Sequence, residues 1–407
     1  MIINNFNLKI KILFISSRAD VGGGPLQMFD IISNIDRNRF TPLAALPDEE
    51  PFYGKIVESG VKTLAIKKRS VSIADIIKLV KFVYSNNIDI VHSHGKGAGI
   101  YSRLLKIFCP QIKVVHTFHG FHYDNLSKSK ECLHKSVEKV LARITDKFVN
   151  VSEGEQLQYA SAGLLDFKKS VLIKNYLPLE KLKTIEKLMQ NSSGKTSSHK
   201  TLKAAAASKV LAEKACRVVS DCVLKFCAVA RFDPVKQMPF LIESFFKVAS
   251  SLKSEEKIKL ILIGGGEEYN KCVKISEQMN ASSLIEFLGE RPDALDIMAG
   301  CDIYISASRR EGLSMSMLEA AAIGMPILAP RVAGIAELVR PYEKGVMFEN
   351  GDYESFKAGL AEIVEKYSEA RNENVNETTA GFASKYEEHS NYIKKYEKLY
   401  IETINGL

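Results

Sequence analysis

Short apolar runs alternate with amphipathic stretches along the first half of the chain. The runs have the length of β-strands and lie at residues 9–16, 88–92, 112–118, 147–152 and 170–176. Helical periodicity fills the segments between them, as at residues 97–107. Strands that alternate with helices favour a parallel sheet covered on both faces. The pattern therefore predicts an α/β domain over residues 1–178.

The same alternation starts again in the second half of the chain. The expected strands lie at residues 223–230, 259–263, 285–288, 303–306 and 326–329. A length of 407 residues also exceeds one ordinary core. We expect a second α/β domain over residues 221–387, so that two Rossmann-like domains face each other across a cleft. Ligands of such sheets bind beyond the carboxyl ends of the strands.

The composition changes between the two halves. Residues 191–200 are polar and poor in apolar side chains, as in flexible connections. We interpret residues 179–220 as an interdomain linker that carries an insertion.

Composition places the chain among globular proteins. Hydrophobic residues make up 46% and charged residues 26% of the chain. No stretch approaches the roughly 20 apolar residues of a spanning helix, and no signal peptide is evident, so we expect a cytoplasmic protein. The 7 cysteines lack C-x-x-C spacing, which favours reduced thiols over disulfides or a zinc site.

The net charge of +8 raises the question of an anionic partner. Nucleic acid is not favoured, because the basic residues are dispersed and no nucleic-acid-binding motif is present. Weak attraction to an anionic membrane surface fits better. The clearest segment is a predicted basic helix at residues 125–147, with apolar positions at Leu133, Val137, Val140, Leu141 and Ile144. The alternative is a surface helix whose apolar stripe faces the core.

Two glutamates eight positions apart give the strongest chemical signal. Glu311 follows the expected strand at 303–306, and Glu319 lies in the next helical pattern, for which Ser314 or Ser316 is a plausible N-cap. A helix N-terminus favours a phosphate, and carboxylates accept hydrogen bonds from sugar hydroxyls. The pair predicts a sugar-nucleotide site, although two solvated helix acids would give the same spacing.

Two further clusters follow strands of the first half. Gly22-Gly23-Gly24 allows a close backbone approach to a phosphate or sugar, but a mere tight turn is equally consistent. The run 115–122 carries His116, His119 and His122, which suits proton transfer or charge stabilisation. A metal site is the alternative, although no acidic partner accompanies these histidines.

A third cluster follows the first strand of the second half. Arg231 and Lys236 lie in one short loop before a helix. A guanidinium and an ammonium group at such a place suit a diphosphate. Ordinary surface ion pairs are the alternative.

Taken together, these motifs resemble the retaining glycosyltransferases of the GT-B fold, in the large family 4. The resemblance covers nearly the whole chain outside the insertion. The residues that carry it are Glu311-Gly312-Leu313-Ser314, Glu319 to Pro326, the Arg231–Lys236 loop, His119-Gly120, Gly264-Gly265-Gly266, and Gly334 with Glu337. The chain departs from the common pattern at Ala230 and Gln237, where glycines are usual.

The resemblance implies a role for each matching residue. Arg231 and Lys236 would grip the donor diphosphate and its leaving charge. Glu319 would bind the ribose hydroxyls, and Glu311 the hydroxyls of the donor sugar. His119 would lie beside that sugar, so that His119, Glu311, Arg231 and Lys236 are the expected catalytic residues.

The remaining donor-binding residues follow from the same resemblance. Backbone amides near Gly312 and Leu313 would hold sugar and phosphate, with Ser314 and Gly265 nearby. Glu290 and Arg291 would lie beside the base. Gly22, Gly23 and Gly24 would close over the diphosphate from the other domain. The C-terminal helix, residues 388–407, would pack back on the N-terminal domain.

The implied reaction moves a sugar from a nucleotide diphosphate, with uridine preferred, to a glycan or polyprenyl-diphosphate-linked acceptor. The sugar would be a hexose or N-acetylhexosamine, and no metal or other cofactor is expected. The setting would be bacterial surface polysaccharide synthesis, such as capsule or O-antigen, at the inner membrane face. The alternative functions are those of a nucleotide-sugar epimerase and of a non-catalytic nucleotide-sugar binding protein. The alternative acceptor is a soluble molecule.

Overall fold

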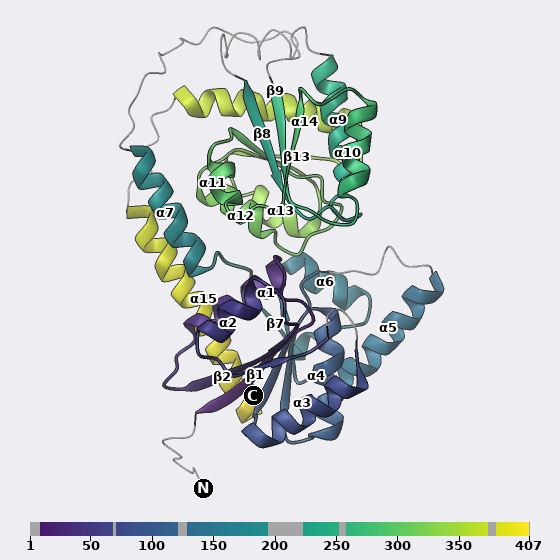
Figure 1. The fold of residues 1–407 in the computed structure, drawn as a ribbon, viewed down its shortest axis with the longest axis vertical. Helices are drawn as coiled ribbons and strands as arrows, with labels where there is room; N and C mark the ends of the chain where they lie inside the picture. Colours follow the sequence, from purple (N-terminus) through teal and green to yellow (C-terminus); the bar gives the residue numbers. More distant parts are fainter. Residues whose placement is uncertain are drawn as a thin grey trace. The chain divides into compact units, whose positions relative to one another are not determined.

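A computed structural model describes residues 9–67, 71–120, 128–193, 223–251, 258–372 and 380–406. Contacts divide the chain into two units, Met1–Leu179 with Lys385–Leu407 and Glu180–Ser384 (Figure 1). Each unit is built on a parallel sheet, as the alternation of strands and helices predicts. Residues 194–222, which make up most of the predicted insertion, lie outside the described residues.

Seven strands form the sheet of the first unit, in the order β3-β2-β1-β4-β5-β6-β7. They are β1 (Ile10–Ser16), β2 (Phe40–Leu46), β3 (Thr63–Ala65), β4 (Ile90–His94), β5 (Lys113–Thr117), β6 (Lys147–Asn150) and β7 (Ser170–Leu172). The order reverses at β1, which pairs with β2 on one side and β4 on the other. Open sheets bind ligands at such a switch point, so the loops after β1 and β4 are placed for binding.

Helices cover both faces of this sheet. They are α1 (Gly23–Asn34), α2 (Phe52–Glu58), α3 (Ile73–Asn86), α4 (Lys96–Phe108), α5 (Lys128–Arg143), α6 (Glu153–Ser161) and α15 (Ala380–Asn405). Side chains of β1 alternate between two cores, because successive strand residues point to opposite faces. Ile12 and Phe14 pack with α1 and α15, whereas Leu13 and Ile15 pack with α3 and α4.

The last helix completes the first unit. From Lys385 onward α15 belongs to this unit, and Tyr392, Tyr396 and Tyr400 are buried in its core. The Tyr400 hydroxyl lies 2.7 Å from His92 Nδ1 on β4. His389 Nε2 lies 2.9 Å from the buried Asp30 carboxylate of α1. A sequence-distant helix thus supplies one layer of this core.

Six strands form the sheet of the second unit, in the order β10-β9-β8-β11-β12-β13. They are β8 (Leu224–Val229), β9 (Ile258–Ile263), β10 (Ile285–Gly289), β11 (Ile303–Ile305), β12 (Ile327–Pro330) and β13 (Gly345–Phe348). Its helices are α7 (Leu179–Ser193), α9 (Met238–Ser250), α10 (Tyr269–Gln278), α11 (Ala294–Ala299), α12 (Met315–Ala322), α13 (Ala333–Val339) and α14 (Tyr353–Asn372). β8 lies between β9 and β11, so the loops after β8 and β11 share one edge.

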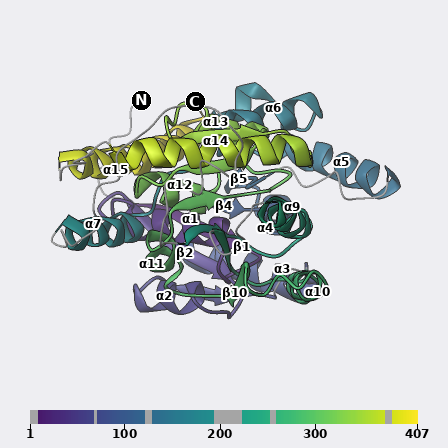
Figure 2. The ribbon, with the colours of Figure 1, turned by 90° about the horizontal axis from the view of Figure 1, so that it is seen from above.

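The predicted basic helix at 125–147 is shorter in the structure. Residues 121–127 lie outside the described residues, α5 ends at Arg143, and Lys147 begins β6. Figures 1 and 2 both show α5 extending away from the strands of its unit. Among the described helices, none is long and apolar enough to cross a membrane.

Candidate active site

The glycine turn of the first unit lies against the predicted histidine. Gly22 precedes α1, which begins at Gly23. A Cβ atom built on Gly24 would lie 3.4 Å from His119 Cδ2. The structure therefore brings the turn after β1 and the turn after β5 together at the switch point of the sheet. A larger side chain at position 24 would meet the imidazole.

His119 has a left-handed backbone conformation that its neighbours hold in place. Its φ is 61°, which is uncommon for a residue with a Cβ atom. The carboxylate of Glu155 accepts hydrogen bonds from the N–H groups of Gly120 and Val151. The Tyr159 hydroxyl donates to the Gly120 carbonyl at 3.0 Å. Sequence reasoning missed Glu155 and Tyr159, which fix the turn from α6 and carry no local motif.

The partly buried His119 contacts buried histidines near this turn. His119 Nε2 lies 3.0 Å from His94 Nδ1, and the two rings stack. His92 lies between the hydroxyls of Tyr400 and Thr117, which is a structural position. Burial lowers the pKa of His92 to about 3 and the pKa of His94 well below its usual value. His92 and His94 are therefore neutral at physiological pH.

The metal alternative needed His116, His119 and His122 together. His116 is buried and its Nδ1 lies 2.9 Å from Ser93 Oγ, while His122 lies outside the described residues. Within the described ranges, no group of three or more His, Cys, Asp or Glu side chains could hold a metal ion.

In the second unit, the glycine turn after β9 supports the Arg231 loop. The Phe232 N–H donates to the Gly265 carbonyl at 2.8 Å. A Cβ atom on Gly264 would lie 1.9 Å from the Ala230 carbonyl oxygen, and one on Gly266 2.6 Å from that of Phe232. Both glycines have positive φ as well. Gly264 and Gly266 therefore make close backbone contacts that side chains would prevent.

Gln237 ends the same loop in a left-handed conformation, with φ 51°. It directly precedes α9, for which it is the N-cap residue. Glycine adopts this conformation without a steric cost, which explains why glycine is usual at this position in the family that the chain resembles. The departure noted from the sequence therefore falls at a position with a real backbone constraint.

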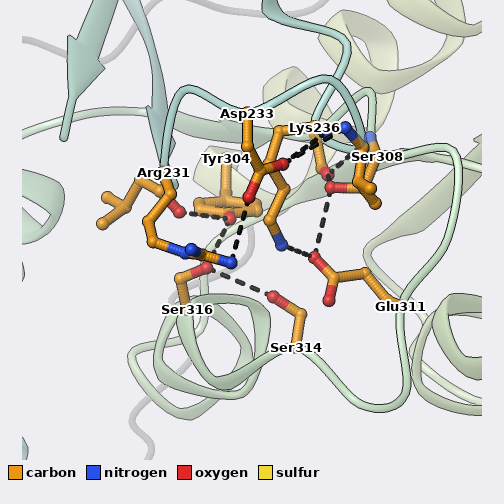
Figure 3. Close-up of polar contacts among 11 residues, drawn as sticks. Arg231, Asp233, Lys236, Tyr304, Ser308, Glu311, Ser314 and Ser316 are labelled. Carbon is orange, nitrogen blue, oxygen red and sulfur yellow. Dashed lines mark hydrogen bonds and ion pairs between the residues drawn. The ribbon is translucent and has the colours of Figure 1, made fainter. Parts of the chain in front are cut away.

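The two cations of this loop reach the start of α12. Lys236 Nζ forms an ion pair with Glu311 Oε1, to which Ser308 Oγ also donates at 3.2 Å. Arg231 lies 3.0 Å from Asp233 and is nearly half exposed. Figure 3 shows the Arg231 and Lys236 tips pointing toward the start of α12. Two cations and a carboxylate thus converge at the ends of β8 and β11.

Hydroxyl groups line the start of α12. Ser314 is the N-cap residue, as predicted, but its side chain caps no backbone N–H and lies 3.2 Å from Ser316 Oγ. Ser316 Oγ also lies 2.7 Å from the Tyr304 hydroxyl of β11 (Figure 3). Burial raises the pKa of Tyr304, so its hydroxyl stays protonated. Tyr304 is a further residue that the sequence did not mark.

Glu319 lies deeper in the same helix. Only 6% of the residue is exposed, and its Oε1 lies 3.1 Å from Lys181 Nζ of α7. Burial raises the pKa of Glu319, and Lys181 lowers it to a smaller extent. The two glutamates therefore have separate cationic partners, Lys236 for Glu311 and Lys181 for Glu319.

The residues expected beside the base lie at the end of β10. A Cβ atom on Gly265 would lie 2.8 Å from Glu290 Oε1, so Glu290 covers that glycine. Arg291 forms a two-pronged ion pair with Asp293, at 2.7 and 2.6 Å, and this pair is exposed. Arg291 lowers the pKa of the Asp293 carboxyl.

The loop at Gly312 and Leu313 is backed by Gly334 of α13. A Cβ atom on Gly334 would lie 1.6 Å from the Gly312 carbonyl oxygen and 2.4 Å from that of Glu311. Gly334→Ala should therefore displace the loop and lower the free energy of unfolding by about 1–3 kcal/mol, as overpacking does. Urea denaturation measures this change. Ala333→Ser, at the exposed preceding residue, is the control, and an equal small effect of both would contradict the close contact.

Two family models match the chain. One, described as glycosyl transferases group 1, matches residues 223–380, and the other, described as glycosyltransferase family 4, matches residues 36–181. Together they cover about three quarters of the chain, one in each unit.

Curated relatives span most of the chain at modest identity. The UDP-Gal:alpha-D-GlcNAc-diphosphoundecaprenol alpha-1,3-galactosyltransferase of Escherichia coli is 24% identical and covers 86% of this chain and 89% of its own. The O-antigen biosynthesis glycosyltransferase WbnH of Escherichia coli is 24% identical, with coverage of 83% and 85%.

Solved structures share the fold. Anabaena HepE in complex with UDP and glucose has a TM-score of 0.69 at 18% identity, covering 98% of this chain and 100% of its own. Sucrose-phosphate synthase from Thermosynechococcus elongatus has a TM-score of 0.70 at 15% identity, with the same coverage.

Proposed function

Because the chain belongs to the glycosyltransferases, of the group 1 and family 4 types on a GT-B fold, we propose that it glycosylates a polyprenyl-diphosphate-linked or other glycan acceptor. The donor is a uridine diphosphate hexose or N-acetylhexosamine, and the anomeric configuration is retained. The product belongs to a bacterial surface polysaccharide, such as capsule or O-antigen. The names of the Escherichia coli relatives, which specify a UDP-galactose donor, a diphosphoundecaprenol acceptor and O-antigen synthesis, support this assignment.

The convergence of Arg231, Lys236 and Glu311 at the start of α12 carries the donor part of the proposal. Two fixed cations suit a diphosphate, and the carboxylate and nearby hydroxyls suit sugar hydroxyls. Glu290 and Gly265 lie at the same edge of the sheet, where the base of the nucleotide binds in this proposal.

In the proposed reaction, the bond between the anomeric carbon and the diphosphate oxygen breaks. Negative charge develops on the departing diphosphate, the acceptor oxygen forms the new glycosidic bond, and the acceptor proton passes to the departing diphosphate oxygen. Preorganised cations stabilise that charge more in the transition state than in the ground state. In this proposal, Arg231 and Lys236 supply these cations. Lys236 interacts with both the bound donor and Glu311.

In this proposal, His119 lies beside the donor sugar, and the turn at Gly22, Gly23 and Gly24 closes over the diphosphate. The stacked His94 ring and the carboxylate of Glu155 fix the histidine turn before any ligand arrives. Such preorganisation lowers the cost of orienting a catalytic group. We also propose that the reaction is metal-independent, because the two cations can neutralise the leaving charge. Undiminished turnover in excess chelator would support this point.

A thermal-shift panel of nucleotide sugars tests the donor. A ligand that binds only the folded chain raises the melting temperature by mass action. We expect the largest rise with one UDP-sugar, and no rise with any nucleotide sugar would contradict the proposal. Consumption of the donor without any acceptor would instead favour the epimerase. Tight binding without product, in every acceptor screen, would favour the binding protein.

We propose that the enzyme works at the cytoplasmic membrane face and attaches through α5. Leu133, Val137 and Val140 are 64%, 44% and 60% exposed and share one face of this helix. The alternative of a core-facing stripe applies to the buried Leu141 but not to these three residues. Basic residues of the same helix are Lys128, Lys130, Lys135, Lys139 and Arg143. An exposed apolar face with basic flanks suits an anionic bilayer.

Flotation with anionic liposomes tests this attachment. The wild-type chain should float at low salt and bind less at high salt, because Debye screening weakens the basic contacts. Leu133→Asp combined with Val140→Asp should reduce binding by about tenfold or more, since each buried apolar side chain contributes about 1.5–3 kcal/mol. Ile77→Asp, at an exposed position of α3, is the matched control. Absence of flotation at low salt, with full activity on a lipid-free acceptor, would favour the soluble acceptor.

A further inference from the structure

Glu319 receives its counter-charge from a helix that the family motifs do not include. Lys181 lies near the start of α7, and its Nζ atom is 3.1 Å from Glu319 Oε1. Leu182 and Ile185 of α7 are fully buried, which fixes the helix that carries this lysine. The lysine itself is partly buried, so solvent screens the pair less than it screens a surface pair.

We propose that Lys181 is a positioning residue for the ribose of the nucleotide. It keeps Glu319 ionised and holds one carboxylate oxygen, so that the remaining lone pairs accept hydrogen bonds from ribose hydroxyls. The inference rests on the proposed function, in which Glu319 binds the ribose. An ionised carboxylate has about four lone-pair sites, and a lysine contact at Oε1 leaves most of them for a ligand.

The other groups around Glu319 do not replace this lysine. Tyr304 of β11 is buried, and its own pKa is raised by burial and further by Glu311 and Glu319. Asp296, the acid of α11 beside α12, is exposed and carries the same charge as Glu319. The neighbouring strand β12 (Ile327–Pro330) holds no titratable side chain. Without Lys181, burial would favour the protonated acid, which accepts fewer hydrogen bonds.

Calorimetric titration with UDP and with 2′-deoxy-UDP tests the inference. In Lys181→Met, UDP affinity at pH 7 should fall about tenfold, equal to about 1.4 kcal/mol. The preference for UDP over the deoxy analogue should fall toward that of Glu319→Gln. Lys181→Arg should retain both the affinity for UDP and the preference for UDP over 2′-deoxy-UDP. Lys183→Met, at an exposed lysine of the same helix, should bind as the wild type does.

The pH dependence of UDP binding gives a second readout. Protonation of Glu319 removes acceptor sites, so affinity falls as the pH drops through the raised pKa of this acid. In Lys181→Met the pKa rises further, and the fall should begin at a higher pH. Glu319→Gln supplies the baseline, because the terminal phosphate of UDP itself titrates near a pKa of about 6.

The outcomes separate the inference from the proposed function. Normal UDP binding by Glu319→Gln would contradict the proposed ribose site. Weak binding by Glu319→Gln with normal or tighter binding by a folded Lys181→Met would contradict only the role of Lys181. If Lys181→Met loses its circular dichroism spectrum, the comparison of Lys181→Arg with Lys181→Gln decides. If Lys181→Arg and Lys181→Gln prefer UDP over 2′-deoxy-UDP to the same extent, the inference is overturned.

Discussion

Arg231→Ala should reduce kcat by about 10²–10³-fold, or about 2.7–4 kcal/mol, at saturating donor and acceptor. The guanidinium is held by Asp233 at 3.0 Å in a loop that the glycine turn after β9 supports from behind. It is therefore in place before the diphosphate begins to leave. Steady-state kinetics with the donor found by the thermal-shift panel measures the change.

Two further variants make the kinetic result specific. Arg231→Lys keeps the charge but loses the planar two-pronged donor, so it should recover only part of the rate. Arg331→Ala removes an exposed arginine of the same unit, paired with Glu349 at 2.7 Å, and should change kcat little. Near-normal turnover in Arg231→Ala would show that this residue does not stabilise the leaving group.

Arg103→Leu should lower the free energy of unfolding of the first unit by about 3–5 kcal/mol. Arg103 is fully buried, its Nη2 lies 2.6 Å from Glu138 Oε1, and its Nε donates to Thr145 Oγ1 at 3.0 Å. Its guanidinium also lies over the Phe148 ring. Removal of the arginine leaves the buried Glu138 without its charged partner, which costs more than the pair itself contributes.

Urea denaturation followed by circular dichroism measures this effect, since the chain has no tryptophan. The two units need not unfold together, so the first-unit transition is compared between variants. Arg103→Leu combined with Glu138→Leu should recover much of the loss, because no charge then stays unpaired. Lys135→Met breaks the partly exposed pair with Glu131 and should cost only about 0.3–0.5 kcal/mol. Equal losses in the single and double variants would contradict the ion-pair explanation.

The sequence predicts the elements of this fold best where apolar runs are long. The strands around Glu311 and Arg231 and the N-cap at Ser314 are confirmed. Strands β2, β3 and β13 are absent from the sequence prediction. β2 contains Pro42, which interrupts a strand pattern, and β3 has only three residues. Pairing with neighbouring strands in the sheet stabilises them, and a local pattern does not contain that contribution.

The partners of the site residues are the part that sequence reasoning could not supply. Lys181 and Glu155 come from elements remote in the sequence from the motifs that they hold, whereas Tyr304 lies in the strand just before its motif. Local spacing places Glu311 and Glu319 at one helix but gives no information on which cation each carboxylate meets. Such pairings are set by tertiary packing. Mutagenesis of these partner residues therefore gives the most information beyond the family resemblance.

The place of α15 after the second unit in the sequence determines when the first unit can finish folding. Ribosomes release the N-terminal residues first, and domains tend to fold as they emerge. Here the seven strands of the first sheet are synthesised long before Tyr392, Tyr396 and Tyr400, which fill its core beside β1 and α1. While the second unit is translated, the part of this core that α15 covers stays exposed in the nascent unit. The core of the first unit can therefore be completed only after α15 has been synthesised.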